Sequence, residues 1–581
     1  MFEMSSLQLT PNAMQVLEAR YLLKDEAGRV IESPDQLFQR VAEAVSKGDG
    51  RASRVWAPKY LRLMRELRFL PNSPTLMNAG KENGQLSACF VLPVEDSLDR
   101  IFDTLKHAAV IHQSGGGTGF AFSRVRAKGS RVKSSQGVAS GPISFMKIYD
   151  TATETIKQGG TRRGANMGVL RIDHPDVVEF IDSKRDGRSI INFNISVGVT
   201  DEFMTALRMS SPFSLRDPQT GKVVKQIDPR ELFERLCQSA WECGDPGVVF
   251  LDRMNRFNPT PKVGEFESTN PCGEQPLLPY ESCNLGSLNL GKYVGESKES
   301  KGFNWAEFSE DVHVAVRFLD NVIEVNEYPV SESEKITLKN RKIGLGVMGW
   351  ADALLKLGIP YGSDEARSLG QQIMSVLDRE AKTASMGLAK ERGPFPNWKG
   401  STWQRLGYQP MRNATVSTVA PTGTISMIAG CSSGIEPIFA AVFFRNVLDG
   451  ARLVDVHPVI EGLLRNQGVT REKWEKGVSD TDLLKWIGPA WSPASKVSVE
   501  DHVRMQAVFQ RFSDSAVSKT INLPQSATVD DIEHAYSLAY DMGCKGITVY
   551  RDQSRSTQVL EEPKRDPESS DNADGEVCPI C

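Results

Sequence analysis

One short stretch of the chain combines residue types that could carry out radical or nucleophilic chemistry. An amide, a thiol and a carboxylate stand at alternate positions, as Asn270, Cys272 and Glu274, and a second thiol, Cys283, follows eleven residues after Cys272. Alternate side chains of an extended segment share one face, so we expect the first three to point into one pocket. The prolines and glycines of this stretch indicate an irregular loop rather than the interior of a helix or strand.

Two other interpretations of this stretch stay open on the residues alone. It could be a proline-rich loop whose cysteines are incidental. It could also belong to a hydrolase with a nucleophilic cysteine, since such a thiol needs only a base nearby. The seven histidines of the chain include no obvious partner that the sequence identifies.

Composition places these residues in an ordinary globular protein. The chain has 581 residues, of which 40% are hydrophobic and 24% charged, enough for a sizeable core. The net charge of −4 argues against a nucleic-acid binder, which normally carries a basic excess. No apolar run is long enough to span a membrane, and the first residues lack a secretory signal. We therefore expect a cytoplasmic protein, whose cysteines are catalytic or metal-binding rather than disulfide-bonded.

The negative charge is concentrated at the C-terminal end. Residues 551–581 contain eight acidic and four basic side chains, and residues 1–550 contain 65 of each sign. The same segment is poor in large apolar residues, a composition that cannot form a core. It ends in Cys578 and Cys581, spaced as Cys-x-x-Cys. We expect residues 553–581 to form a flexible acidic tail that carries a dithiol.

The elements that position these residues follow from hydrophobic periodicity. Apolar positions three and four apart predict helices over 12–23 and 34–45, the second capped by Ser33. Further along, helical patterns alternate with short apolar runs such as 247–251 and 343–348. This alternation is typical of an α/β fold with parallel strands.

Three other segments resemble common motifs. Residues 158–165 have the glycine spacing of a phosphate-binding P-loop, but Ala165 and Asn166 stand where Lys and Ser/Thr are needed. Residues 115–119 are glycine-rich, and we expect them to permit tight packing. Small hydroxyl residues and a glycine in 421–426 open a predicted helix, which could bind an anion. We interpret His457 as structural, because the glycine that follows it comes too late for a cobalamin-binding Asp-x-His-x-x-Gly signature.

The loop around Cys272 resembles the active-site loop of ribonucleotide reductases. Six further motifs occur in the order found in that family, at residues 69–80, 86–90, 115–123, 158–165, 420–426 and 546–551. The adenosylcobalamin-dependent (class II) branch is the most similar. Class I large subunits carry adjacent tyrosines where this chain has only Tyr550, and the glycyl-radical motif of class III enzymes is missing from the sequence.

The resemblance implies a fold, a reaction and a cofactor. The fold would be a ten-stranded α/β barrel, built from two antiparallel halves of five parallel strands around a central finger loop. Residues 1–60 would form an N-terminal helical region too short for an ATP-cone, and 61–552 the barrel. The reaction would be reduction of ribonucleotides, more specifically diphosphates, to 2′-deoxyribonucleotides, with adenosylcobalamin as radical source.

The resemblance also implies roles for individual residues. Cys272 would hold the thiyl radical, Glu274 would be the general base and Asn270 would bind the ribose hydroxyls. Cys89 and Cys283 would supply two electrons by closing to a disulfide. The substrate would be bound by hydroxyl and backbone groups of Ser73, Thr75, Ser87, Thr422, Gly423, Thr424, Ile425 and Ser426. The allosteric effector would contact Asp96, Arg126, Lys157, Gln158 and Arg162. No metal ligand is expected.

Partners follow from the same resemblance. Deoxynucleotides or ATP would act as specificity effectors, and a homodimer is expected. Cys578 and Cys581 would reduce the Cys89–Cys283 disulfide and would in turn be reduced by thioredoxin or glutaredoxin. Half of a zinc ribbon is the alternative for this pair, although one Cys-x-x-Cys supplies only two ligands. For the whole chain, the alternatives are a class I large subunit that needs a metal-radical partner, and a cysteine-rich zinc or redox-binding scaffold.

Overall fold

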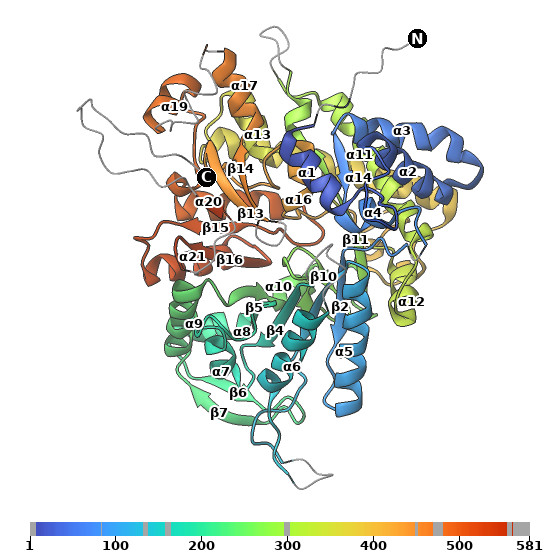
Figure 1. Cartoon of the computed structure of the whole chain (residues 1–581). Helices are drawn as coiled ribbons and strands as arrows, with labels where there is room; N and C mark the ends of the chain where they lie inside the picture. The colour runs from blue at the N-terminus through green and yellow to red at the C-terminus, as the bar shows by residue number, and fades with distance from the viewer. Residues whose placement is uncertain are drawn as a thin grey trace.

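A computed structural model describes residues 7, 9–82, 84–131, 137–156, 164–295, 302–447, 451–466, 468, 480–554 and 560–561. One large sheet crosses the molecule, and helices cover it on both sides (Figure 1). Among the described residues, no helix is both long enough and apolar enough to cross a membrane.

The N-terminal region is helical, in agreement with the periodicity of its sequence. Its helices are α1 (Pro11–Arg20), α2 (Pro34–Ser46) and α3 (Ser53–Arg65), and they are followed by α4 (Ser73–Asn78). The 3-10 turn η1 (Lys47–Ala52) joins α2 to α3. The predicted cap of α2 is confirmed: Ser33 accepts the Gln36 N–H, and the Gln36 side chain accepts the Ser33 N–H. This reciprocal capping fixes the start of the helix.

The central sheet has ten strands. Its order is β1-β11-β2-β3-β4-β5-β8-β16-β15. The tenth strand, β12, lies off this path and pairs with β11 along the edge opposite to β1. The bounds are β1 (Phe69–Pro71), β2 (Cys89–Pro93), β3 (Gly117–Ala121), β4 (Asn166–Arg171), β5 (Phe193–Val199), β8 (Gly247–Phe250), β11 (Ser282–Asn289), β12 (Ile343–Met348), β15 (Thr520–Leu523) and β16 (Gly546–Arg551). The strands predicted at 247–251 and 343–348 are confirmed as β8 and β12.

Parallel pairing dominates this sheet, which confirms the predicted α/β class. Strands β2, β3, β4, β5 and β8 form one run of five parallel strands. Antiparallel pairs join this run to β11 on one side and to β16 on the other. Among the residues that the structure describes, the regular ladder ends at β12, and single parallel bridges, Leu345 to Ser417 and Val419 to Val517, continue toward β15.

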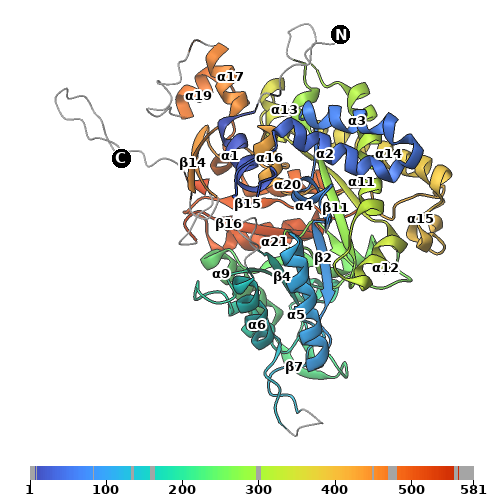
Figure 2. The same ribbon diagram turned by 45° about the vertical axis from the view of Figure 1, so that its right-hand side comes forward.

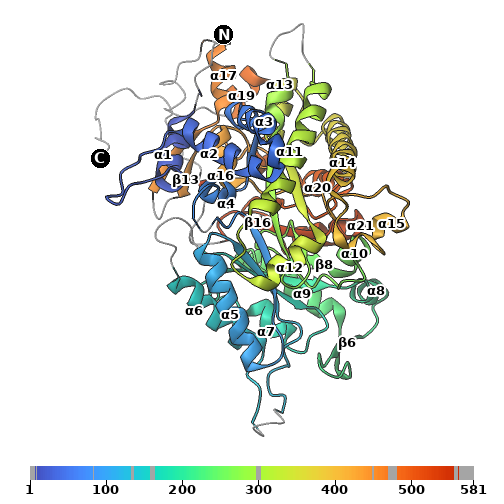
Figure 3. The same cartoon turned by 90° about the vertical axis from the view of Figure 1, so that its right-hand side faces the viewer.

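Two hydrophobic clusters hold the helices against the sheet. One lies under α11 (Trp305–Val325), α14 (Asp364–Arg392) and the N-terminal helices. These helices lie close together in Figure 3. The other lies under α5 (Leu98–Gln113), α6 (Pro142–Thr155), α9 (Pro229–Cys243) and α21 (Val529–Asp541). Helices α5 and α6 lie side by side at one end of the molecule (Figure 2). The sheet is therefore buried on both faces, as parallel sheets require.

The remaining elements are short or peripheral. The helices are α7 (Val177–Asp182), α8 (Asp201–Met209), α10 (Leu251–Arg256), α12 (Ser331–Asn340), α13 (Trp350–Leu357), α15 (Thr402–Arg405), α16 (Gly423–Ala429), α17 (Pro458–Asn466), α19 (Asp480–Ile487) and α20 (Val499–Gln510), with 3-10 turns η2 (Leu290–Tyr293), η3 (Pro396–Trp398) and η4 (Ala494–Lys496). The strands are β6 (Phe213–Arg216), β7 (Val223–Ile227), β9 (Ser268–Thr269), β10 (Pro276–Leu277), β13 (Val442–Val447), β14 (Ala451–Val456) and β17 (Leu560–Glu561).

Candidate active site

Cys272 lies at the tip of a tight loop between the paired strands β9 and β10. The loop is closed by Asn270 and Gln275: the Asn270 N–H donates to the Gln275 carbonyl (3.1 Å), and the Gln275 N–H donates to Asn270 Oδ1 (3.0 Å). The expectation of an extended segment with alternate side chains on one face is therefore wrong. The asparagine side chain turns the backbone instead, and this leaves Cys272 exposed at the tip.

Glycines of β3 allow this loop to approach the sheet. A Cβ atom on Gly119 would lie 1.7 Å from the Thr269 carbonyl oxygen, and one on Gly117 would lie 2.9 Å from the Pro271 ring. Only glycine admits so close a contact. The interpretation of the 115–119 glycines as residues that permit tight packing is thus confirmed, and the loop around Cys272 is what packs there.

The other side of the loop is fixed through its backbone. The Glu274 carbonyl accepts hydrogen bonds from the Ala516 N–H (2.8 Å) and the Thr418 hydroxyl (3.0 Å). The segment before Ala516 is in turn bound by a buried amine, because Lys545 Nζ donates to the carbonyls of Asp514 (2.6 Å) and Ser515 (2.7 Å). Glu274 itself is buried. Two layers of hydrogen bonds therefore set its position.

Lys545 was missed by sequence reasoning. It directly precedes β16, and nothing in its neighbours distinguishes it from a surface lysine. In the structure it is 4% exposed, and burial lowers the pKa of its amine to about 7, an effect that the nearby Asp514 opposes. Its contact with the carbonyls of Asp514 and Ser515 identifies it, and a single sequence does not reveal a contact between segments so far apart.

Cys89 and Cys283 are opposite each other on neighbouring antiparallel strands, β2 and β11. Both are buried and unbridged. Asn270 connects this pair to the loop, since its Nδ2 donates to Cys89 Sγ at 3.0 Å. Burial, followed by the charges of Glu274, Cys283 and Cys272, raises the pKa of the Cys89 thiol well above its ordinary value. The structure thus brings together all five predicted catalytic residues.

A buried ion pair, also missed from the sequence, lies beside Cys283. Lys342 Nζ is 2.6 Å from Glu281 Oε2, and both side chains are fully buried. The Cys283 thiol donates to the Lys342 carbonyl at 3.5 Å. Burial raises the pKa of Cys283 well above its ordinary value, and the Lys342 charge opposes this shift.

The residues predicted to bind substrate fall into two groups. The helix predicted after 421 is confirmed as α16, and Thr422 before it accepts the Gly434 N–H (2.7 Å) while Ser426 shares a hydrogen bond with Ser433 (2.9 Å). The other group has its hydroxyls engaged elsewhere: Ser73 with the Tyr21 hydroxyl (2.7 Å), Thr75 with the Leu86 carbonyl (3.0 Å) and Ser87 with Asn326 (3.5 Å).

Two of the predicted effector residues contact each other. Arg126 Nε donates to Asp96 Oδ2 (2.7 Å), and the Arg126 N–H donates to Asp96 Oδ1 (3.1 Å). Asp96 directly precedes Ser97, which caps α5. The other predicted effector residues, Lys157, Gln158 and Arg162, lie outside the described residues, as do Cys578 and Cys581.

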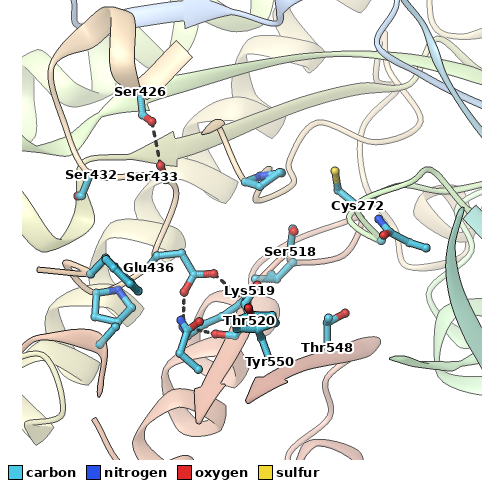
Figure 4. A pocket seen from close by; sticks show the side chains of 18 of the residues that line it. Cys272, Ser426, Ser432, Ser433, Glu436, Ser518, Lys519, Thr520, Thr548 and Tyr550 are labelled. Atoms are coloured by element: carbon cyan, nitrogen blue, oxygen red, sulfur yellow. Dashed lines mark hydrogen bonds and ion pairs between the residues drawn. The ribbon is translucent and has the colours of Figure 1, made fainter. Parts of the chain in front are cut away.

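Cys272 forms part of the wall of a large cavity of about 600 Å³ (Figure 4). Residues of β8 and β16 line one part of the cavity, among them Val249, Thr548 and Tyr550 (Figure 4). Another part is polar: Glu436 Oε2 is 2.6 Å from Lys519 Nζ, and Glu436 Oε1 accepts the Thr520 N–H (2.7 Å). The cavity can hold a large, partly apolar molecule in contact with the exposed thiol.

Comparison with known families accounts for this arrangement. A family model described as "Ribonucleotide reductase, barrel domain" matches residues 87–550, and one described as "Ribonucleotide reductase, all-alpha domain" matches residues 7–84. The chain belongs to the ribonucleotide reductase family. The resemblance of its motifs to that family is confirmed.

Three curated ribonucleotide reductases illustrate the similarity. The vitamin B12-dependent ribonucleoside-diphosphate reductase of Thermoplasma acidophilum is 48% identical, over 95% of this chain and 80% of its own length. The protein of that name from Mycobacterium tuberculosis is 47% identical, over 95% of this chain and 81% of its own. The vitamin B12-dependent ribonucleotide reductase of Streptomyces clavuligerus is 34% identical, over 86% of this chain and 60% of its own.

Proposed function

We propose that this ribonucleotide reductase converts ribonucleoside diphosphates into 2′-deoxyribonucleoside diphosphates with adenosylcobalamin as its cofactor. The single observation that carries the proposal is the grouping of three thiols at one place. Cys272 stands on the loop tip, and Asn270 of the same loop donates to Cys89, the strand partner of Cys283. The names of the relatives at 47–48% identity support the cofactor and the diphosphate substrate, and they do not favour a class I large subunit or a metal-binding scaffold.

Each thiol then has a distinct task. The Cys272 radical removes the 3′-hydrogen of the ribose, and the Glu274 carboxylate takes the proton of the 3′-hydroxyl while Asn270 binds the ribose hydroxyls. The 2′-hydroxyl leaves as water with a proton from one of the two thiols of Cys89 and Cys283. These thiols supply two electrons, give the second hydrogen to C2′ and close to a disulfide. The hydrogen held by Cys272 then returns to C3′, and Glu274 returns the proton to the 3′-oxygen.

The cavity beside Cys272 is the site that we propose for the cofactor. Its volume of about 600 Å³, its lining by residues of β8, of β16 and of 432–439, and its direct access to the thiol suit one face of a large ring placed next to the loop tip. Residues of β8, of β16 and of the segment 432–439 would hold it. When bound, adenosylcobalamin supplies the organic radical that converts the Cys272 thiol to a thiyl radical.

The diphosphate would bind at α16. The backbone of residues 423–425 presents N–H groups in the first turn of this helix, and a side chain on Gly423 would face open space. Ser73, Thr75 and Ser87 would add to this site only through backbone or rearranged hydroxyl groups, since their hydroxyls already have partners.

The finer features of the fold and assembly belong to the same proposal. The sheet would close into a ten-stranded barrel, which the parallel bridges Leu345–Ser417 and Val419–Val517 support. A homodimer would form through α5 and α6. Their exposed apolar side chains support this: Leu98 (64%), Phe102 (47%), Val110 (37%) and Ile148 (40%). Analytical sedimentation of a Phe102→Arg variant tests this interface. A monomer would support the interface, and a dimer would contradict it.

Regulation and re-reduction complete the proposal. A deoxynucleotide or ATP effector would bind where Asp96 and Arg126 meet at the start of α5. Contacts with Lys157, Gln158 and Arg162 would make the choice of substrate base depend on which effector is bound. Cys578 and Cys581 would reduce the Cys89–Cys283 disulfide and pass the oxidation on to thioredoxin or glutaredoxin.

Replacement of the loop thiol tests the function directly. Cys272→Ser should lose deoxynucleotide formation by at least a thousandfold while it still binds cobalamin, because an exposed side chain contributes little to the fold. Cys243→Ser, which alters a partly buried thiol outside the cavity lining, is the matched control. Retained turnover by the Cys272 variant would remove the proposed mechanism.

A further inference from the structure

Asn194 of β5 binds the peptide group that joins Pro271 to Cys272. Its side-chain nitrogen Nδ2 donates to the Pro271 carbonyl at 2.9 Å. Asn194 is the exposed residue of a strand that is otherwise buried, and it lines the same cavity as Pro271 and Cys272. An amide on the cavity wall is therefore engaged with the loop, at the peptide next to the exposed thiol.

The peptide that Asn194 contacts is the central one of a β-turn. The Gly273 N–H donates to the Asn270 carbonyl (3.1 Å), so Pro271 and Cys272 are the two central residues of this turn. Type I and type II turns can both have this hydrogen bond, and they differ by a flip of the central peptide. A flip changes the sign of φ at the second central residue, so it would redirect the Cys272 side chain.

The hydrogen bond from Asn194 favours one of the two orientations. Cys272 does not have a positive φ, which excludes the type II form for this turn. In the flipped form the Pro271 carbonyl would point away from Asn194, and their hydrogen bond would be lost. The Pro271 ring cannot simply follow, because it packs against Gly117, where an added Cβ atom would lie 2.9 Å from the ring.

The backbone on both sides of Asn194 is itself held by a buried ion pair. Lys184 Nζ lies 2.8 Å from Asp245 Oδ2, and the two side chains are 11% and 6% exposed. Lys184 Nζ also donates to the Phe193 carbonyl, and Asp245 Oδ1 accepts the Ile195 N–H at 3.4 Å. Asn194 therefore extends from a part of β5 whose position is fixed on either side.

We propose that Asn194 is a positioning residue for Cys272, and that it holds the Pro271–Cys272 peptide in the orientation that directs the thiol to its reaction partners. This inference rests on the proposed function, since it concerns the thiol that becomes the radical. Asn194 acts through the loop and takes no part in the chemistry.

Three substitutions of Asn194 test the proposal by their effect on turnover. Asn194→Leu keeps the shape and removes the donor, Asn194→Asp puts a carboxylate opposite the Pro271 carbonyl, and Asn194→Gln keeps an amide donor. At saturating substrate and adenosylcobalamin, kcat should fall at least tenfold in the Leu variant. It should fall about a hundredfold in the Asp variant, since displacements of about 1 Å can cost that much. The Gln variant should stay within threefold of the natural chain.

Binding separates positioning from direct contact with substrate or cofactor. KM and the dissociation constant of adenosylcobalamin, from equilibrium dialysis in the dark, should stay within threefold in all three variants. The control is Asn192→Leu, two residues away, where the side chain binds Asp150 (3.2 Å) and does not line the cavity. This control should keep kcat within twofold. Circular dichroism and the melting temperature identify a variant that fails to fold, and the Asp variant replaces the Leu variant if the latter does so.

A crystal structure of Asn194→Asp, at pH 8 and without substrate or cofactor, tests the proposal without turnover. The Pro271 carbonyl should point away from residue 194, and Cys272 should have a positive φ. An unflipped peptide would overturn the proposal, as would natural kcat in the folded Leu and Asp variants. Cobalamin binding weakened tenfold with natural kcat at saturation would also overturn it, because Asn194 would then be a cofactor ligand. If the natural chain were inactive with adenosylcobalamin, the proposed function would fail, and this crystal structure would still decide whether Asn194 orients the peptide.

Discussion

Cys89 and Cys283 are direct partners in the antiparallel pairing of β2 with β11, and both thiols are buried. Opposite residues on such strands have Cβ atoms about 4.5–5.5 Å apart, close to the separation that a disulfide requires. The pair can therefore be oxidised with little movement of either strand. Because Asn270 donates to Cys89, one hydrogen bond connects the loop that carries Cys272 to this pair.

Oxidation of the pair is the first prediction. One round of reduction without an external thiol should leave Cys89 and Cys283 joined, and peptide mass spectrometry should find the bridge. Cys89→Ser and Cys283→Ser should each lower multiple turnover more than a hundredfold, because neither leaves a complete dithiol. Cys237→Ser, at another buried thiol, should not. A single-round product with both thiols still reduced would contradict this role.

The glycine of β3 gives a second prediction. Gly119→Ala puts a methyl group where the Thr269 carbonyl lies, at 1.7 Å, so the loop that carries Cys272 must move. We expect kcat to fall at least a hundredfold, since displacements of about 1 Å can cost that much. Gly387→Ala in α14, where no atom lies within 4 Å, is the control and should be fully active. Normal kcat in Gly119→Ala would show that the loop position does not matter.

The buried amine of Lys545 predicts a pH dependence of stability. Its pKa of about 7 in the folded chain is below the ordinary value near 10.5, so the unfolded chain binds more protons between these two pH values. The contribution of Lys545 to stability must therefore rise with pH from about 7 to about 10.5. Urea unfolding at several pH values should show a smaller rise in Lys545→Met than in the exposed control Lys485→Met. Equal slopes would mean that Lys545 titrates normally.

The ion pair of Lys342 and Glu281 predicts that removal of one partner lowers the free energy of unfolding strongly, and that removal of the second partner restores part of it. Lys342→Met leaves a fully buried carboxylate without its partner, which should cost about 3–5 kcal/mol in urea unfolding. The double variant Lys342→Met/Glu281→Leu should recover part of this loss. Lys128→Met, at an exposed pair with Glu179, should cost less than about 1 kcal/mol. If the loss of unfolding free energy in the double variant equalled the sum of the losses in the two single variants, the two side chains would not stabilise the fold through each other.

Local features of the fold could be predicted from the sequence because their causes are local. The Ser33 cap and Pro34 start α2, and apolar runs with glycines at their ends give β8 and β12. The sequence predicts the position of the loop around Cys272, but it does not predict the shape of this loop. The side-chain hydrogen bond of Asn270 to the Gln275 N–H turns the chain, and no periodicity reports such a bond.

Residues that act through distant contacts could not be found in the same way. Lys545 and Lys342 gain their roles from partners on other strands and loops, and their neighbours in sequence are unremarkable. The register that sets Cys89 opposite Cys283 is likewise a property of the assembled sheet. The family motifs include the two cysteines, but the two supporting lysines belong to none of those motifs.

The central claim is that this one chain carries the whole radical reaction with adenosylcobalamin. The direct measurement is anaerobic conversion of a ribonucleoside diphosphate to its 2′-deoxy product by the purified chain, given adenosylcobalamin and dithiothreitol and no other protein. The account predicts steady product formation that stops when the cofactor is left out. Product that appears only after a second, metal-containing protein is added would contradict it.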